Sequence, residues 1–522
     1  MLALPNELLE EILHHVERLQ DRKNLRRTCS RLALVLRPYV LKEVTLNIYK
    51  GNAESGMNLL GALAAPKNVY SPCVRTLYID SLSPSHYPIG YKGKTQSWRG
   101  KAILGRTFGG NEKSTNSHLR TLLKPALESL EGLEAIRWCW QEKDSQWSLK
   151  IIMQSFSALR DVKEFTFYYG PIVDITIPYP DLPNLRILSI STPQEEPIGQ
   201  WNWTPSHSLL LKHLLNCSSS LSALHLDSRM VFYADSHLGH ALPEMSLHSS
   251  ITHLSLSGWS LPILRPFTAY VSKLPNLTSL RIFMRYHSSS PLKDFFSALS
   301  ANHIHLRRLV LDGEVDVKPV LDYIEGYSGL EVLCLIGVHS HPYVADRFYR
   351  IILPLHNDTL VELDIQPLFQ STWCFGTHNA EAIRRCRKLR RLSVGVSNQV
   401  EGQMVPVLNP VYLLLRIVSS SLPELQALHI DSCYEYRLFH RSVDDGPSPC
   451  NVVPHCEREI PYDPEVLRWV RICIGGEKLT LDDAMGLNGD LADSDTQIHT
   501  TTSTSLPLLL KAATGRFTWK KK

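Results

Sequence analysis

The residues best suited to metal chemistry lie in the segment CNVVPHCE at 450–457, which places Cys450, His455 and Cys456 close together. Thiolates and imidazoles are ligands that zinc prefers, but a structural zinc site usually takes four ligands from two separated pairs. This cluster has no second pair at a suitable spacing. We therefore interpret it as a loop with incidental thiols, and we predict no metal site and no cofactor.

Common catalytic motifs are also absent from the sequence. There is no glycine-rich phosphate loop, no nucleophile elbow and no zinc-binding H-E-x-x-H. The 22 histidines are dispersed, and several of them fall at positions that the repeat described below explains. We predict that the chain is not an enzyme, with catalysis in the loops of the fold as the remote alternative.

Length and charge narrow the class of protein. The chain has 522 residues, which is too many for one compact core, so several domains or an elongated repeat array are expected. Its 55 basic and 51 acidic residues give a net charge of +4, which is too close to balance to indicate a nucleic-acid or membrane partner. We expect neither.

The first residues, MLALPNELLEEIL, contain proline and glutamates where a signal peptide has a basic patch and an apolar stretch. Apolar stretches such as VYLLLRIV at 411–418 are far shorter than the roughly 20 residues that a membrane-spanning helix needs. The 11 cysteines are odd in number and irregularly spaced, which is typical of reduced thiols. We expect an intracellular protein of the cytoplasm, the nucleus or both.

One apolar phrase recurs along the chain. LPNLRILSI at 182–190 returns as LPNLTSLRI at 274–282 and as LPELQALHI at 422–430. Reduced to its apolar positions, the phrase is L-x-x-L-x-L, and from Leu185 to Leu425 its copies are on average 30 residues apart. The first residues of the thirteen copies, here called the anchors, are Leu41, Val74, Leu133, Val162, Leu185, Leu221, Ile251, Leu277, Leu306, Leu330, Leu360, Leu389 and Leu425.

The spacing within each copy predicts its structure. The last two apolar residues of a copy are two apart, so in a strand they point to the same side. Helical spacing of apolar residues occurs between the copies, at 149–156, 267–274, 292–299, 317–324 and 411–418. Each unit is therefore predicted to be a strand followed by a helix. The fold class is α/β: a curved solenoid with parallel strands on its inner face and helices on its outer face, and its apolar skeleton resembles leucine-rich repeats.

The first forty residues have a different pattern. The segment LPNELLEEILHHV at 4–16 predicts an amphipathic helix that begins near Pro5. A second helix is predicted after Asp21, as its N-cap, with a stripe formed by Leu25, Cys29, Leu32 and Leu36. Seven basic residues between 18 and 37 have no interleaved aromatics, so we interpret them as solvated faces of this helix rather than a nucleic-acid site.

LPNELLEEIL followed by LRRTCSRLALVLRPYVLKEVTL resembles an F-box, the short helical module that binds the Skp adaptor of cullin-RING ubiquitin ligases. One departure is Leu32, where many F-boxes have tryptophan. The alternative is a helical cap that seals the first repeat. The residues that the resemblance assigns to the adaptor contact are Leu4, Pro5, Leu8 and Ile12, supported by Leu25 and Cys29.

The resemblance implies that the repeats select the protein to be ubiquitinated. The residue between the paired apolar positions of each copy should then face the concavity and contact the substrate, although many of these positions could be plain solvated surface. The row has few charges and does not provide the arginine cluster that a phosphorylated peptide would need. It consists of Tyr78, Arg137, Thr166, Ser189, His225, Ser255, Arg281, Val310, Cys334, Asp364, Ser393 and His429.

The domain organisation follows from these patterns. We predict a helical module over 1–40, a solenoid over 41–474 and a largely disordered tail over 475–522. Two irregular insertions are expected inside the solenoid, at 83–118 and 442–464. The first could instead hide one degenerate repeat, and we favour a loop.

The sequence thus predicts a non-catalytic substrate-recognition subunit of a Skp-cullin-F-box ubiquitin ligase. Its expected partners are a Skp-type adaptor, through it a cullin, and an unknown protein substrate. The alternative is a leucine-rich-repeat scaffold that acts outside a ligase. Co-purification of the adaptor and the cullin distinguishes the two hypotheses.

Overall fold

The structure is a computed structural model, and it divides into two compact units, Met1–Asn276 and Leu277–Lys522. This division falls inside the stretch predicted as one solenoid. The residues that the structure describes are 4–16, 18–66, 68–87, 112–141, 143–168, 179–191, 205–227, 250–257, 268–284, 290–314, 316–338, 340–397, 410–433, 508–513 and 516–521. The predicted insertion at 442–464 and the cysteine cluster at 450–457 lie outside them.

Unit 1 begins with four short helices, α1 (Asn6–His14), α2 (Leu19–Arg26), α3 (Ser30–Val35) and α4 (Arg37–Val40). The prediction of one helix after Asp21 was wrong, because the helical conformation is interrupted between α2 and α3. The hydroxyl of Thr28 donates to the carbonyl of Leu25 at 2.8 Å, and the extended Cys29 accepts the N–H of Leu32 on its sulfur at 3.4 Å. Asp21 lies in the first turn of α2 and is not its cap.

Seven strands follow among the described residues of unit 1, and each is hydrogen-bonded in parallel to the next along the chain. Every one of them starts two residues after a predicted anchor, as the L-x-x-L-x-L pattern requires. The strands are β1 (Glu43–Tyr49), β2 (Thr76–Ser83), β3 (Ala135–Cys139), β4 (Glu164–Tyr168), β5 (Ile187–Ser191), β6 (Ala223–Asp227) and β7 (His253–Ser257).

Unit 2 continues the same arrangement. Its parallel strands are β8 (Ser279–Phe283), β9 (Arg308–Asp312), β10 (Val332–Val338), β11 (Glu362–Pro367), β12 (Arg391–Ser397) and β13 (Ala427–Cys433). Together with unit 1, the described residues contain one parallel strand for each of the thirteen anchors. The α/β class and the parallel sheet with accompanying helices are thus confirmed.

Two short strands lie near the end of the chain. Strands β14 (Leu508–Ala513) and β15 (Arg516–Lys521) pair with each other, and β15 pairs antiparallel with β13. Both strands fall within the tail 475–522, whose remaining residues lie outside the described ones. An unpaired edge strand exposes its backbone N–H and C=O groups, and pairing with β15 occupies that edge of β13.

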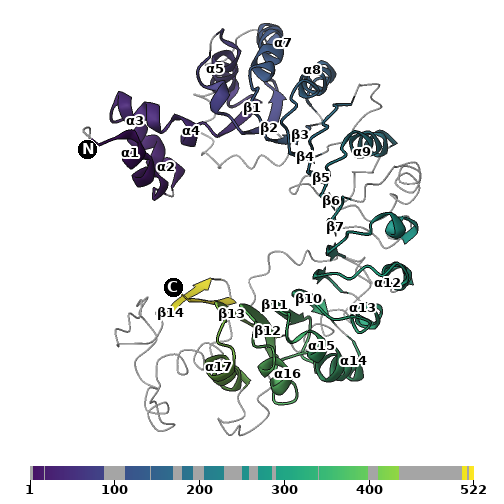
Figure 1. The fold of residues 1–522 in the computed structure, drawn as a ribbon. Coiled ribbons are helices and arrows are strands. Elements are labelled where there is room, and N and C mark those ends of the chain that lie inside the picture. Colours follow the sequence, from purple (N-terminus) through teal and green to yellow (C-terminus); the bar gives the residue numbers. More distant parts are fainter. Residues whose placement is uncertain are drawn as a thin grey trace, which may run out of the picture. The chain divides into compact units, whose positions relative to one another are not determined.

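The helices that follow β1 lie on one side of the strands of their unit (Figure 1). Unit 1 has α5 (Ala53–Ala64), η1 (Ser71–Cys73), α7 (Glu112–Glu128), α8 (Gln146–Phe156), α9 (Pro205–Cys217) and η3 (Val271–Lys273). Unit 2 has α12 (Ser290–Ala301), α13 (Lys318–Ile324), α14 (Pro342–Arg347), η4 (Phe348–Ile352), α15 (Leu353–His356), α16 (Ala380–Arg384) and α17 (Pro410–Ser421). Within the described part of the chain, no helix combines the length and apolarity needed to cross a bilayer.

Burial follows the predicted alternation. Twelve of the anchors are almost fully buried, and the exception is Leu41, which ends α4 and is half-buried. The inward residues of the strands pack against the helices: the ring of Phe165 on β4 meets that of Phe156 on α8 with centroids 6.1 Å apart. Neither a strand nor a helix could bury such rings alone, so each repeat depends on its own helix and on its neighbours.

The first predicted insertion, at 83–118, proves shorter than expected, because α7 already begins at Glu112. Strand β2 pairs directly with β3. The long spacing between their anchors therefore adds no strand to the sheet at this point. Residues 88–111 lie outside the described residues.

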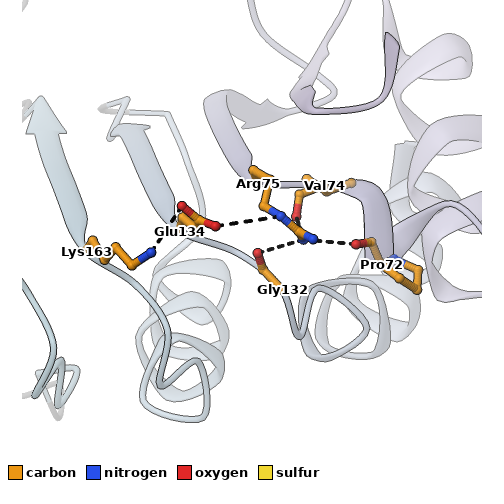
Figure 2. Close-up of polar contacts among 6 residues, drawn as sticks. All are labelled: Pro72, Val74, Arg75, Gly132, Glu134 and Lys163. Carbon is orange, nitrogen blue, oxygen red and sulfur yellow. Dashed lines mark hydrogen bonds and ion pairs between the residues drawn. The ribbon is translucent and has the colours of Figure 1, made fainter. Parts of the chain in front are cut away.

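A charged chain links the turns that precede three neighbouring strands of unit 1 (Figure 2). The guanidinium of Arg75 donates to the carbonyls of Pro72 and Gly132 at 2.9 and 3.0 Å. Its Nε lies 3.7 Å from Glu134, which in turn pairs with Lys163 at 3.3 Å. A Cβ at Gly132 would lie 2.2 Å from the guanidinium, so glycine is needed for this approach. This series of charged side chains provides hydrogen-bond donors for turn carbonyls that the strands leave unpaired.

A buried histidine has a comparable role in unit 2. His356 is 1% exposed; its Nδ1 accepts the N–H of Leu330 at 3.3 Å, and its Nε2 donates to the carbonyl of Ile324 at 3.1 Å. These two bonds require the neutral ring, because the acceptor Nδ1 must carry no proton. Burial lowers the pKa of His356 from its ordinary value of 6.5.

We predict that His356 makes unit 2 sensitive to acid. Since the unfolded chain binds this proton more readily than the folded one, the stability that neutral His356 contributes is present above its ordinary pKa of 6.5 and is lost as the pH falls toward its lower folded value. His356→Gln should reduce the drop in melting temperature between about pH 7 and about pH 5. Thermal unfolding, monitored by circular dichroism at both pH values, measures this drop in melting temperature. A variant with the same pH dependence as the wild type would contradict this role, and the exposed His118→Gln serves as control.

Candidate functional site

Helix α1 is apolar on both of its faces. Leu8 and Ile12 are four residues apart, so they lie on one face, and their side chains are 50% and 42% exposed. Pro5, immediately before the helix, is also exposed. We call Pro5, Leu8 and Ile12 the apolar ridge. These large apolar side chains, left in water on a short helix, make the ridge a candidate contact surface.

The opposite face of α1 is buried within the helical module. Leu9 and Leu13 are 2% and 3% exposed and belong to a small core with Leu32, Val35, Leu36 and Val40. Leu4, Leu25 and Cys29, which the sequence analysis assigned to the adaptor contact or its support, are partly buried and pack against this core. The six assigned residues thus separate into three ridge residues and three that hold the module together.

A residue that the sequence analysis did not single out fixes the start of α1. Arg31, on α3, donates from Nε and Nη2 to the side-chain oxygen of Asn6 at 3.2 and 3.0 Å, and from Nη2 to the carbonyl of Leu4. At the other end of α1, Nε of Arg22 donates to the carbonyl of Val16 at 2.6 Å. Both ends of the helix are therefore held, which determines the direction in which the ridge points.

The predicted substrate-contacting residues occupy equivalent positions on neighbouring strands. In unit 1 the register aligns Tyr78, Arg137, Thr166, Ser189, His225 and Ser255. In unit 2 it aligns Arg281, Val310, Cys334, Asp364, Ser393 and His429. Because strand side chains alternate, both rows lie on the face opposite the buried apolar pairs, which we call the open face.

Access to a partner differs along these rows. Arg137 and Arg281 are exposed, whereas Val310 and Cys334 are 7% and 5% exposed and offer little area for contact. Asp364, Glu362 and Arg308, on other strands of the sheet, all act electrostatically on Cys334. Burial and these carboxylates raise the pKa of Cys334 to about 12, so its thiol stays protonated at neutral pH.

Polar contacts on the open face connect adjacent strands. In unit 1, Nη1 of Arg137 lies 3.3 Å from the hydroxyl of Tyr78, and its guanidinium lies 5.3 Å from the centre of that ring. In unit 2, the amide of Gln366 donates to Asp364 at 2.9 Å and to Ser393 at 3.1 Å. These contacts hold donors and acceptors of the open face in fixed positions.

The described residues contain one group whose side chains converge as metal ligands do: Asp181, His213 and Cys217. Sequence reasoning missed it. His213 and Cys217 are four apart, which on a helix would place them on one face, but Asp181 is 32 residues away from His213 and only the fold brings it there.

No protein-family model matches the sequence, and a search of curated proteins finds no significant match.

We predict that Arg31→Ala loosens the start of α1. The substitution removes the hydrogen bonds to Leu4 and Asn6, which should cost about 1 to 2 kcal/mol locally and speed amide exchange in the first turns of α1 roughly tenfold. Hydrogen–deuterium exchange by mass spectrometry measures it, with strand β1 as internal reference. Arg31→Lys keeps the charge without the planar fork and should give partial protection. Unchanged exchange in both variants would rule out the positioning role.

Proposed function

We propose that this protein is a non-catalytic substrate-recognition subunit of a Skp-cullin-F-box ubiquitin ligase. The observation that carries the proposal is the two-sided α1: Leu9 and Leu13 are buried in the module's own core, while Leu8 and Ile12 remain in water. A helix that served only to cap the first repeat would not need apolar residues on its outer face. The ridge residues are also those that the F-box resemblance assigns to the adaptor contact.

The mechanism in this proposal is positional. The ridge on α1 binds a Skp-type adaptor and, through it, a cullin, while the repeats bind the protein to be modified. Lysines of that substrate then meet the charged ubiquitin-conjugating enzyme at raised effective concentration, so that this chain needs no catalytic group or cofactor. Such a ligase operates in the cytoplasm or the nucleus, which is where we place this protein.

The open face of a leucine-rich-repeat-like solenoid is the proposed substrate surface. This proposal is supported by the strand register, which aligns one polar or charged residue from most strands on the open face. These residues include the exposed Arg137 and Arg281. Fixed pairs such as Gln366 with Asp364 present both donors and acceptors, which suits an uncharged or mixed peptide surface. Val310 and Cys334 are too buried to contribute much and are left out of the proposed contact.

The competing hypothesis is a scaffold that uses its repeats outside any ligase. It would leave the ridge without an adaptor to bind. Affinity capture of the intact chain beside a ridge variant distinguishes the two, because a scaffold would bring down the same proteins in both cases.

We predict that Leu8→Asp combined with Ile12→Asp abolishes adaptor binding. Two carboxylates buried in an apolar contact without partners cost several kcal/mol, so the dissociation constant should rise by about a thousandfold or more. Both sites are exposed in the free chain, and the fold should therefore tolerate the change. Isothermal titration calorimetry, with a purified Skp-type adaptor titrated into the full chain, measures the dissociation constant.

A closely matched control is Ile351→Asp with Leu355→Asp. These residues are also four apart, and their exposed fractions of 50% and 43% are close to those of the ridge pair. The control should bind the adaptor like the wild type. Equal binding by the folded ridge variant would rule out this interface, and equal loss in both variants would show that added charge alone is responsible.

We also predict that Arg137→Glu reduces substrate capture without affecting the adaptor. Reversing an exposed charge on the open face should cost about one charge-assisted hydrogen bond, or roughly tenfold in affinity. Quantitative mass spectrometry of captured proteins measures it, with Arg160→Glu, at an exposed turn of the same unit, as control. If both variants capture the same proteins in the same amounts as the wild type, the open face around Arg137 is not the substrate surface.

A further inference from the structure

Three side chains of unit 1 direct one polar atom each toward a common point. Oδ1 of Asp181 lies 3.0 Å from Nε2 of His213, and Sγ of Cys217 lies 3.3 Å from the same oxygen and 3.5 Å from the same nitrogen. Two of these residues come from the last turn of α9, and the third comes from the segment before β5. The three atoms form a nearly equilateral triangle.

These separations are those of ligands around a tetrahedral zinc ion. Zinc binds nitrogen and oxygen at about 2.0 to 2.2 Å and sulfur at about 2.3 Å. A tetrahedral angle then places nitrogen and oxygen ligands about 3.4 Å apart, and sulfur about 3.6 Å from either. The three distances observed here are each within about 0.4 Å of these values, so little movement would be needed to bind an ion.

The surrounding structure holds the three residues in place. The hydroxyl of Ser218, next to Cys217, donates to the carbonyl of Leu182, next to Asp181, at 3.1 Å. Both Ser218 and Leu182 are buried, so this bond fixes the end of α9 against the segment before β5. The ring of Tyr179 packs on that of His213, with centroids 5.6 Å apart. The cluster is therefore positioned by buried backbone and not only by mobile side chains.

A catalytic cysteine is a weaker interpretation of the same cluster. In a triad, one ring nitrogen of the histidine faces the nucleophile and the other faces the carboxylate. Here Nε2 of His213 faces both Asp181 and Cys217, so no proton can be passed through the ring. Convergence of all three atoms on one point is what a metal ion requires.

We propose that Asp181, His213 and Cys217 form a zinc-binding site with three protein ligands. Borderline-soft Zn²⁺ accepts thiolate, imidazole and carboxylate together, whereas Mg²⁺ and Ca²⁺ select oxygen ligands alone. The thiol of Cys217 releases its proton when the metal–sulfur bond forms. Asp181 is 70% exposed, so the fourth position is open to water or to a ligand from a partner. This site is independent of the proposed ligase function.

Cobalt(II) titration of the full chain tests the site, because Co²⁺ occupies zinc sites and a cobalt–thiolate bond gives a charge-transfer band in the near ultraviolet. Chelator-treated protein under a metal-free reductant should show this band at one equivalent of Co²⁺, and Zn²⁺ should abolish it. Cys217→Ser should remove the band, whereas Cys73→Ser, at another half-buried free cysteine, should retain it.

His213→Gln and Asp181→Asn should each weaken Co²⁺ binding by roughly tenfold or more. Even changing a residue that only hydrogen-bonds to a metal ligand typically lowers metal affinity by about 10- to 100-fold. Circular dichroism checks that each variant is folded, and the exposed Asp181→Asn provides a test even if the less exposed positions do not tolerate substitution. Absence of the charge-transfer band in the wild type would overturn the proposal. A band that survives in Cys217→Ser, or that does not weaken when His213 and Asp181 are changed, would also overturn it.

Discussion

The whole fold depends on one constraint: no repeat of this chain can bury its own leucines. A single strand with one helix covers too little apolar surface, so each repeat is stable only when its strand pairs with the next. The backbone makes this pairing regular. The carbonyl of Lys163, for example, accepts hydrogen bonds from the N–H groups of both Arg186 and Ile187, at 2.7 and 2.9 Å. The same pair of hydrogen bonds to one carbonyl recurs at most repeats. Alternation along each strand then decides which residues are buried and which remain on the open face.

The N-terminal module applies the same physics with a different result. Four short helices enclose a small core, and that core needs only one face of α1. The residues of the other face, Leu8 and Ile12, have no structural task within the described module. Exposure alone does not identify a docking surface, since Ile351 and Leu355 are equally exposed. What distinguishes the ridge is its position on a helix held at both ends by Arg31 and Arg22.

Much of the fold could be predicted because its signal is local. The period-two pattern after Val74 or Leu306 needs no knowledge of the rest of the chain, and the strands appear where the anchors place them. Helices with strong periodicity, such as α8 and α12, were predicted for the same reason. Residues 268–270 are α-helical and run directly into η3, so helical structure occurs in the predicted segment 267–274 as well.

The features that were missed depend on contacts between distant residues or on competing local bonds. The break between α2 and α3 arises because Thr28 and Cys29 bond to nearby backbone groups, which a continuous apolar stripe conceals. Strands β14 and β15 flank Thr514-Gly515, where glycine favours a turn, but the pairing of β15 with β13 joins residues about ninety apart in the sequence. The convergence of Asp181 with His213 and Cys217 likewise has no pattern in the sequence. Burial of Val310 and Cys334 depends on their neighbours across the sheet.

The most direct test of the central claim is hydrogen–deuterium exchange on the full chain with and without a purified Skp-type adaptor. If the ridge is the docking surface, the complex should form, and the amides of α1 should become protected while those of the open-face strands remain unchanged. Failure to form a complex, or protection confined to the strands with none on α1, would contradict the account.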